Sequence, residues 1–140
     1  MWDKLYEKMS SVRNLELAWM RLKTGQNIQY KKYYRNLFLA YELTEKENIK
    51  RLSERLLGGS YKPSSILRFY LPKFSGLQRP ITFLHLDDLI VYQALANVIA
   101  DKFSNARKNV EFGNVFSNVL NRNKETKIFF FKRWQEGYGL

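Results

Sequence analysis

Apolar residues recur at helical spacing through the N-terminal part of the chain. The first of them are Leu5 and Met9, followed by Leu15, Trp19 and Leu22. Residues spaced in this way share one face of a helix, so the pattern predicts one or two helices over about residues 2–23. The stretch Thr24–Asn27 contains a glycine and polar residues, and it breaks the pattern.

Two further helices are predicted before the middle of the chain. The first covers about residues 29–41. Its apolar stripe consists of Tyr33, Leu37 and Tyr41. The second opens at a capping box, in which Thr44 caps the helix and Glu47 reaches back to the capping residue. Gly58-Gly59 ends this helix, because glycine readily adopts the left-handed conformation found at helix C-termini.

After a loop at Ser60–Pro63 the hydrophobic period changes to two. One face of the expected strand carries Ile66, Arg68 and Tyr70, and the other face carries Leu67, Phe69 and Leu71. Ser75-Gly76 supplies a tight turn, since glycine tolerates a positive φ, and Ile81 resumes the strand pattern. The segment therefore predicts an antiparallel β-hairpin over residues 60–84.

From about Leu86 to about Ser104, apolar residues surround most of a long predicted helix. Such a helix should be the central buried helix of the fold. Asp87 and Asp88 lie in its first turn, where carboxylates interact favourably with the helix dipole. A metal site built on this pair is the weaker alternative, because neighbouring helical residues point about 100° apart.

Polar residues on and around this helix have structural and functional interpretations. Gln93 and Asn97 either reach the bases of a template strand or satisfy buried backbone groups, and we favour the second interpretation. The single histidine, His85, has no catalytic partner set in the sequence, so we expect it to be structural or exposed. Further along, a short helix is predicted between Phe116 and Leu120 and a last one over residues 124–135.

These elements define an α+β fold that is mostly helical with one antiparallel β-hairpin. A chain of 140 residues is long enough for one domain with a genuine core. We expect a single domain over residues 1–140. Its parts are N-terminal helices at 1–57, the basic β-hairpin at 60–84, the central helix at 85–105 and short C-terminal helices at 106–140.

Charge points to the class of partner. The chain has 24 Lys and Arg against 13 Asp and Glu, a formal net charge of +11 and a pI near 9.9. This excess favours polyanions, nucleic acid first and an anionic membrane surface second. The predicted helix at 29–41 also carries a basic face, made of Lys31, Lys32 and Arg35. Such a face is most often solvated, but it can also contact an RNA or DNA backbone.

The composition excludes several other classes of protein. The chain has no cysteine, which excludes disulfides, cysteine-based zinc sites and a cysteine nucleophile. Its N-terminus lacks an apolar signal core, and no apolar run approaches the length of a membrane span. We therefore expect a cytoplasmic protein that has no membrane partner.

The hairpin carries the candidate chemistry. Lys73 enters the turn and Arg79 leaves it, so both cations are held on one stiff ribbon. A lysine point charge and an arginine fork together make a good clamp for phosphate oxygens. The alternative is an ordinary surface hairpin that carries incidental charges.

The hairpin and the helix after it resemble a known family. Residues 72–81 read PKFSGLQRPI, and residues 87–95 read DDLIVYQAL. Across about residues 50–120 the chain resembles the fingers region of bacterial reverse transcriptases, those of group II introns, retrons and antiviral defence systems. In that family an Asp-Arg pair begins the helix. Here Asp88 is followed by Leu89, so the contact made by the family's arginine is not expected.

The resemblance implies roles for individual residues. Lys73 and Arg79 would contact the triphosphate of the incoming dNTP, with Gly76 of the turn close to this ligand. The residues expected to contact nucleic acid are Lys31, Lys32, Arg35, Lys62 and Arg68. The implied partners are an RNA template, an RNA/DNA duplex, and the remaining polymerase domains or a partner subunit.

The resemblance also implies a parent RNA-directed DNA polymerase, a nucleotidyltransferase that uses two Mg²⁺ ions held by aspartates. Those aspartates lie on a strand beyond the fingers and in an aromatic-x-Asp-Asp turn. The sequence contains neither, and after Glu111 its only acidic residues are Glu125 and Glu136. We therefore expect an N-terminal fragment with no catalytic residue and no metal ligand, inactive alone. The alternative is a standalone basic helical module that binds nucleic acid or a protein partner.

Overall fold

A computed structural model describes residues 2–24, 28–111 and 119–120 of the chain. The elements in this part are α1 (Trp2–Ser10), α2 (Val12–Thr24), α3 (Ile28–Glu42), α4 (Glu45–Leu57), β1 (Leu67–Pro72), β2 (Gln78–Phe83), α5 (Leu86–Lys102) and α6 (Ser104–Glu111). The described chain is thus mostly helical, with one antiparallel sheet of two strands. This confirms the α+β class.

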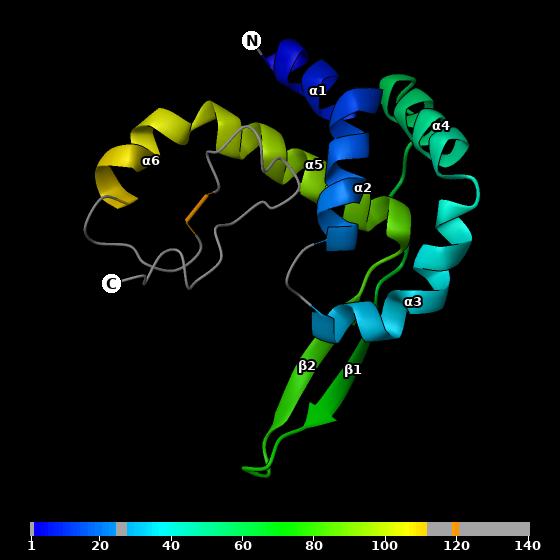
Figure 1. Cartoon of the computed structure of the whole chain (residues 1–140), viewed down its shortest axis with the longest axis vertical. Coiled ribbons are helices and arrows are strands. Elements are labelled where there is room, and N and C mark those ends of the chain that lie inside the picture. Colours follow the sequence, from blue (N-terminus) through cyan, green and yellow to red (C-terminus); the bar gives the residue numbers. More distant parts are fainter. Residues whose placement is uncertain (1, 25–27, 112–118, 121–140) are drawn as a thin grey trace.

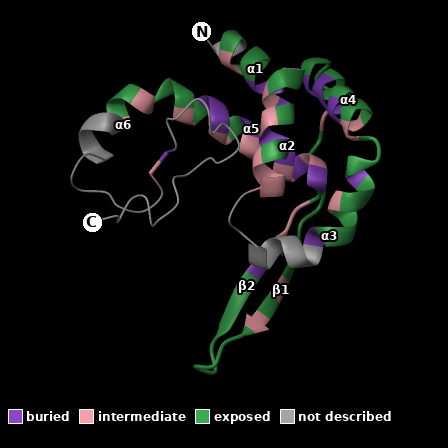
Figure 2. Ribbon diagram, in the orientation of Figure 1, coloured by how far each residue is buried: buried purple, intermediate pink, exposed green. Residues whose placement is uncertain are grey.

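The helices form a body from which the hairpin projects (Figure 1). Helix α5 packs against α1 and α2, and α4 packs against the same two helices. Buried residues gather where these helices meet, whereas the hairpin is largely exposed (Figure 2). The buried apolar cluster is centred on Leu15, Trp19, Ile49, Leu52 and Ile90. None of the described helices is long and apolar enough to cross a membrane.

Helix α5 is buried on one side only within the described structure. Leu86, Ile90 and Ala94 face the core, as the prediction of a central helix requires. Tyr92, Leu95, Ile99 and Phe103 are exposed instead. The predicted central buried helix is therefore buried along one face, while its other apolar face is exposed. The apolar sequence cannot reveal which of two apolar faces has a partner.

Helix α3 follows the predicted stripe at Tyr41 but not at Leu37. Tyr34 and Tyr41 are buried, and Phe38 packs against them, but Leu37 is 54% exposed. Tyr34 and Phe38 rings stack at 5.8 Å, and the Phe38 ring meets Trp19 edge-on at 5.3 Å. The face of α3 that turns inward is the one that contacts Trp19 of α2. The spacing of residues within α3 does not reveal this partner.

The predicted capping box does not form. Thr44 occupies the N-cap position of α4 but makes no side-chain cap hydrogen bond. Its hydroxyl accepts a bond from the Asn48 side chain at 3.0 Å instead, and Glu47 pairs with Arg51. Instead, Glu45 in the first turn of α4 bonds to residues of α2. The sequence did not indicate this contact.

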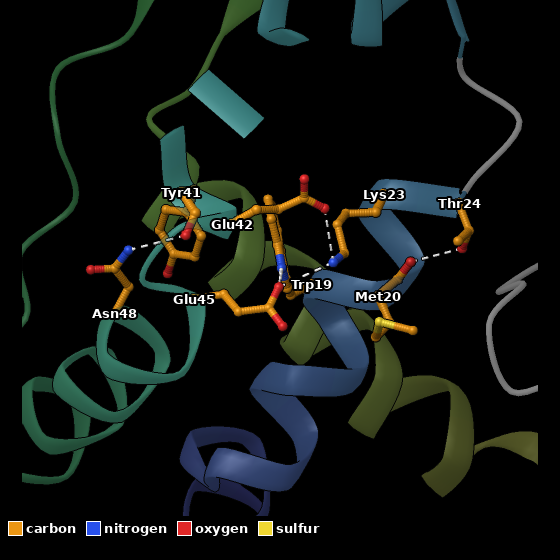
Figure 3. Close-up of polar contacts among 8 residues, drawn as sticks. All are labelled: Trp19, Met20, Lys23, Thr24, Tyr41, Glu42, Glu45 and Asn48. Atoms are coloured by element: carbon orange, nitrogen blue, oxygen red, sulfur yellow. Dashed lines mark hydrogen bonds and ion pairs between the residues drawn. The ribbon is translucent and has the colours of Figure 1, made fainter. Parts of the chain in front are cut away.

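Glu45 connects α4 to α2 through a small polar cluster (Figure 3). Its carboxylate accepts hydrogen bonds from Trp19 Nε1 at 2.8 Å and from Lys23 Nζ at 3.1 Å. Lys23 also pairs with Glu42 at 3.1 Å. The bond from Trp19, followed by Lys23, lowers the pKa of Glu45. Burial opposes the charge on Lys23, but its two carboxylate partners together raise its pKa.

The predicted helix stop at Gly58-Gly59 is confirmed. Gly59 has a φ of +67°, in the left-handed region that disfavours other residues. The Ser60 amide donates to the Arg55 carbonyl at 3.0 Å, and the Gly59 amide donates to Leu56 at 3.1 Å. This pair of bonds is the Schellman motif, which satisfies the last carbonyls of the helix.

The C-terminal predictions are only partly covered. Helix α6 follows α5 directly, and the sequence pattern did not separate these two helices. Val119 and Leu120 are described and are not helical, so a helix through Leu120 is wrong at that end. The remainder of that helix and the helix over 124–135 lie outside the described residues.

Candidate anion-binding site on the hairpin

The hairpin closes through a three-residue loop. Strand pairing ends with Pro72 opposite Gln78. The Lys73 amide then donates to the Leu77 carbonyl at 2.8 Å, and the Gly76 amide donates to the Lys73 carbonyl at 3.0 Å. Gly76 has a φ of +79°, as expected for the left-handed residue that ends such a loop. The turn predicted at Ser75-Gly76 is confirmed, and glycine is required there.

Lys73 lies one residue beyond β1, and continuing the strand alternation to it puts Lys73 on the same face of the ribbon as Arg79. Residues directly opposite each other in an antiparallel pair share a face, and Arg79 pairs with Leu71. Lys73 follows Leu71 by two positions, so it returns to the same face. In that arrangement Lys73 and Arg79 are diagonal neighbours across the ribbon. This face continues through Ile81, which is buried.

Arg68 lies on the opposite face of the ribbon. It pairs with Thr82 and shares its face with Tyr70, and both of these residues are exposed. Lys62 belongs to the loop before β1 and is also exposed. Among the predicted cations whose side chains are described, strand alternation groups only Lys73 with Arg79.

The basic face predicted for α3 is described only in part. Arg35 is exposed on this helix. The side chains of Lys31 and Lys32 lie outside the described part of the chain. The structure consequently gives no arrangement for this group of three cations.

Within the described part of the chain, the cations of the hairpin have no acidic partner. Between Glu54 and Asp87 the sequence contains no acidic residue. Among the described residues no carboxylate pairs with the exposed side chains of the predicted site, namely Lys62, Arg68, Lys73 and Arg79. An uncompensated group of this kind produces a positive potential that attracts anions.

Aromatic stacking and one hydroxyl hold the base of the hairpin to the helical body. The Tyr34 ring stacks on Phe83 at 4.7 Å, and Phe83 contacts Phe69 at 4.8 Å. The Tyr34 hydroxyl donates to the Leu84 carbonyl at 2.9 Å and accepts from the Leu84 amide at 2.8 Å. Burial raises the pKa of Tyr34, so this hydroxyl stays protonated and keeps both bonds at neutral pH. Sequence reasoning did not find this anchor.

Asp88 fixes the loop that leads into β1. It is buried, and its carboxylate accepts hydrogen bonds from the Tyr61 hydroxyl and from the Ser64 amide, the latter at 3.0 Å. Burial, followed by this carboxylate, raises the pKa of Tyr61. Asp88 therefore does more than complement the dipole of α5. It ties the first turn of that helix to the entry of the hairpin.

Asp87 points to different partners. It accepts a hydrogen bond from Arg55 at 2.9 Å and a longer one from the Tyr41 hydroxyl at 3.4 Å. The described residues contain no group of three or more His, Cys, Asp or Glu side chains that could hold a metal ion. Nearby, His85 is exposed at the N-cap of α5 and makes no side-chain cap bond, which agrees with the exposed role predicted for it.

Gln93 and Asn97 belong to the contact between α2 and α5. The Asn97 oxygen accepts bonds from Arg21 and from Gln93, the latter at 2.9 Å, and the Asn97 amide donates to the Asn14 side chain at 3.1 Å. Asn14 in turn donates to the Ala94 carbonyl at 3.0 Å. The favoured interpretation was that Gln93 and Asn97 bond buried backbone groups directly. The bonds shown for both residues are to side chains, and Asn14 makes the backbone contact.

Comparisons of the chain with protein-family models, with curated proteins and with solved structures found no match.

Proposed function

We propose that the chain binds nucleic acid through its hairpin, as the N-terminal fingers portion of an RNA-directed DNA polymerase. One feature carries the proposal, which is a ribbon without acidic residues on which the strand alternation, continued one residue past β1, puts Lys73 on the face of Arg79. Phosphate groups are the anions that such a pair fits best, because arginine binds two oxygens in one plane while lysine adds a mobile charge.

In this proposal the helices fix the base of the hairpin, and its tip is free to contact the ligand. Tyr34 and the ring stack around Phe83 hold its root, while Asp88 holds the loop before β1. The tip projects beyond the helices (Figure 1). Lys73 and Arg79 would contact the triphosphate of an incoming nucleotide and offset the negative charge that grows during transfer. Gly76 in the turn leaves room for the ligand.

The parent polymerase would require Mg²⁺ for the chemical step. The described residues offer no cluster able to hold it. The role proposed for this chain is therefore binding and positioning, and the chain alone should join no nucleotides.

A second candidate function is a protein-interaction module. The observation that favours it is the exposed apolar face of α5, formed by Tyr92, Leu95, Ile99 and Phe103. Contiguous apolar patches often mark protein interfaces. This function leaves the uncompensated hairpin charge unexplained, so we rank it second.

Equilibrium binding of the chain to a fluorescently labelled RNA/DNA duplex with a single-stranded overhang tests the proposal. We expect affinity to fall steeply with salt, because bound phosphates release counterions when cations replace them. A dNTP should compete better than the corresponding monophosphate if the clamp holds a triphosphate. Binding that is flat with salt would contradict nucleic-acid binding, and equal competition by both nucleotides would contradict the triphosphate clamp.

A further inference from the structure

Phe74 is the most exposed large apolar residue of the described chain. Its relative exposure is 114%, compared with 85% for Leu43, the next highest value among these residues. It is the first residue of the three-residue loop, just after Lys73. Figure 1 places this loop at the far end of the ribbon, away from every helix. The ring therefore contributes nothing to the core.

The turn itself does not require an aromatic residue at this position. The left-handed conformation falls on Gly76, and the first loop position accepts most residue types, with polar ones common in turns. Leu77 on the other side of the loop is also exposed, at 65%. Two apolar side chains at a solvated tip indicate a surface that is covered when a ligand binds.

The charges around the ring define the chemistry of that ligand. Lys73 precedes Phe74 directly, Arg79 lies on the same ribbon face as Lys73, and no acidic residue lies within the hairpin. A ligand complementary to this tip has a flat apolar surface close to negative charge. An unpaired nucleotide has both, as a base that can stack and a phosphate beside it.

An anionic membrane surface shares part of this chemistry. Membrane-binding elements bury a broad apolar face, however. Here the exposed apolar side chains beside Phe74, namely Tyr70 and Leu77, are separated by exposed polar and basic ones such as Lys73, Gln78 and Arg79, so the ribbon has no broad apolar face. One ring on a narrow ribbon matches one base better than it matches a bilayer.

We propose that Phe74 stacks on an unpaired base of a single-stranded nucleic acid while Lys73 and Arg79 hold the neighbouring phosphates. This inference rests on the proposed function and names its substrate more closely, as a single strand or an overhang. Stacking is tolerant of sequence because every base presents a π-face. The tip should therefore prefer single strands to blunt duplexes without preferring a base.

Three substitutions test the ring. Phe74→Leu keeps an apolar side chain and removes the ring, Phe74→Trp enlarges the ring, and Phe74→Ala removes both. The probes are a labelled single-stranded 20-mer of mixed sequence, a blunt duplex of the same sequence, and vesicles of phosphatidylserine and phosphatidylcholine. We expect Phe74→Leu and Phe74→Ala to weaken single-strand binding by roughly tenfold, and Phe74→Trp to preserve or increase it. Binding to the blunt duplex should change less than twofold.

The outcomes separate this inference from the proposed function. If the Phe74→Leu variant binds the single strand as tightly as the parent chain while salt dependence stays steep, stacking is wrong and nucleic-acid binding stands. If binding of the parent chain does not depend on salt, both the stacking inference and the proposed nucleic-acid binding are wrong. Loss of vesicle binding in Phe74→Leu together with unchanged oligonucleotide binding would assign the tip to a membrane and overturn the inference. Far-UV circular dichroism checks that each variant is folded.

Discussion

The helical body and the hairpin use basic residues in opposite ways. In the body, Lys8 pairs with Asp101, Arg55 with Asp87, and Lys23 with Glu42 and Glu45. In the described hairpin, Lys73 and Arg79 have no acidic partner. The same residue types thus help to position helices in one region and remain available for an external anion in the other. Net charge alone does not distinguish the two uses.

Aromatic residues also differ between the helical body and the hairpin tip. Trp19 is 1% exposed, contacts Phe38 and Tyr41, and donates to Glu45. Phe74 is fully exposed and has no ring contact within the described residues. A ring buried in the body contributes to stability, whereas the exposed ring at the tip does not contribute to the core.

The largest effect on stability is expected from removing a buried ring of the helical body. Trp19→Ala should lower the free energy of unfolding by about 3–5 kcal/mol, because it leaves a cavity and removes the indole hydrogen bond to Glu45, which then keeps only its Lys23 partner. Phe74→Ala, the matched control at an exposed ring, should change it by less than about 0.5 kcal/mol. Urea denaturation followed by circular dichroism measures both. A similar loss in the two variants would contradict the division between body and tip.

The next largest effect is expected from replacing one cation in each region. Lys73→Ala should weaken nucleic-acid binding by about 1.5–3 kcal/mol, since it removes one charged contact, and should leave stability unchanged. Lys23→Ala should do the reverse, lowering stability slightly and leaving affinity unchanged, because its charge is neutralised by Glu42 and Glu45. Fluorescence anisotropy and urea denaturation on each variant provide the two readouts. Equal losses of affinity would show that position on the hairpin does not matter.

The connection between the two regions can be weakened separately. Tyr34→Phe removes the hydroxyl that bonds both backbone groups of Leu84, and we expect a loss of about 1–2 kcal/mol in stability. Hydrogen exchange at the Leu84 amide should speed up. Tyr70→Phe on the exposed face of β1 is the control and should change neither quantity. An unchanged exchange rate in Tyr34→Phe would mean that ring stacking alone anchors the ribbon.

The smallest expected effect is a pH dependence confined to the body. The pKa of Glu45 is lowered from 4.5 in the folded chain, so its ionised form is stabilised by folding. That stability is fully present above the ordinary pKa and is lost as the pH falls through the folded pKa. Glu45→Gln should therefore reduce the loss of stability on acidification below about pH 4.5. Denaturation curves of both proteins from pH 7 to pH 3 measure this loss. If the stability of the two proteins falls equally with pH, Glu45 does not cause the pH dependence.

The sequence predicts local features of this molecule better than long-range partners. The stop at Gly58-Gly59 and the hairpin turn at Gly76 were predictable, because each depends on a conformation that only a few residue types adopt. The inward stripe of α3 was not predictable, since Leu37 is as apolar as Phe38. The choice between them depends on Trp19 and Phe83, which lie far away in sequence.

The candidate site shows the same limit. The alternation of side chains along the strands was sufficient to place Lys73 and Arg79 on one face and Arg68 on the other. The anchors of the hairpin were not visible in the sequence, because Tyr34 and Asp88 find their partners only after the chain folds. The capping box failed for a related reason, since Glu47 has a closer cationic partner in Arg51.

The most direct test compares two double variants of equal charge. Lys73→Ala with Arg79→Ala removes the hairpin pair, and Lys50→Ala with Arg51→Ala removes two cations that α4 pairs with Glu54 and Glu47. The slope of log affinity against log salt should fall by about two for the hairpin variant and stay unchanged for the helical variant. Equal changes in the two slopes would show that binding follows net charge alone, and would contradict a phosphate site on the hairpin.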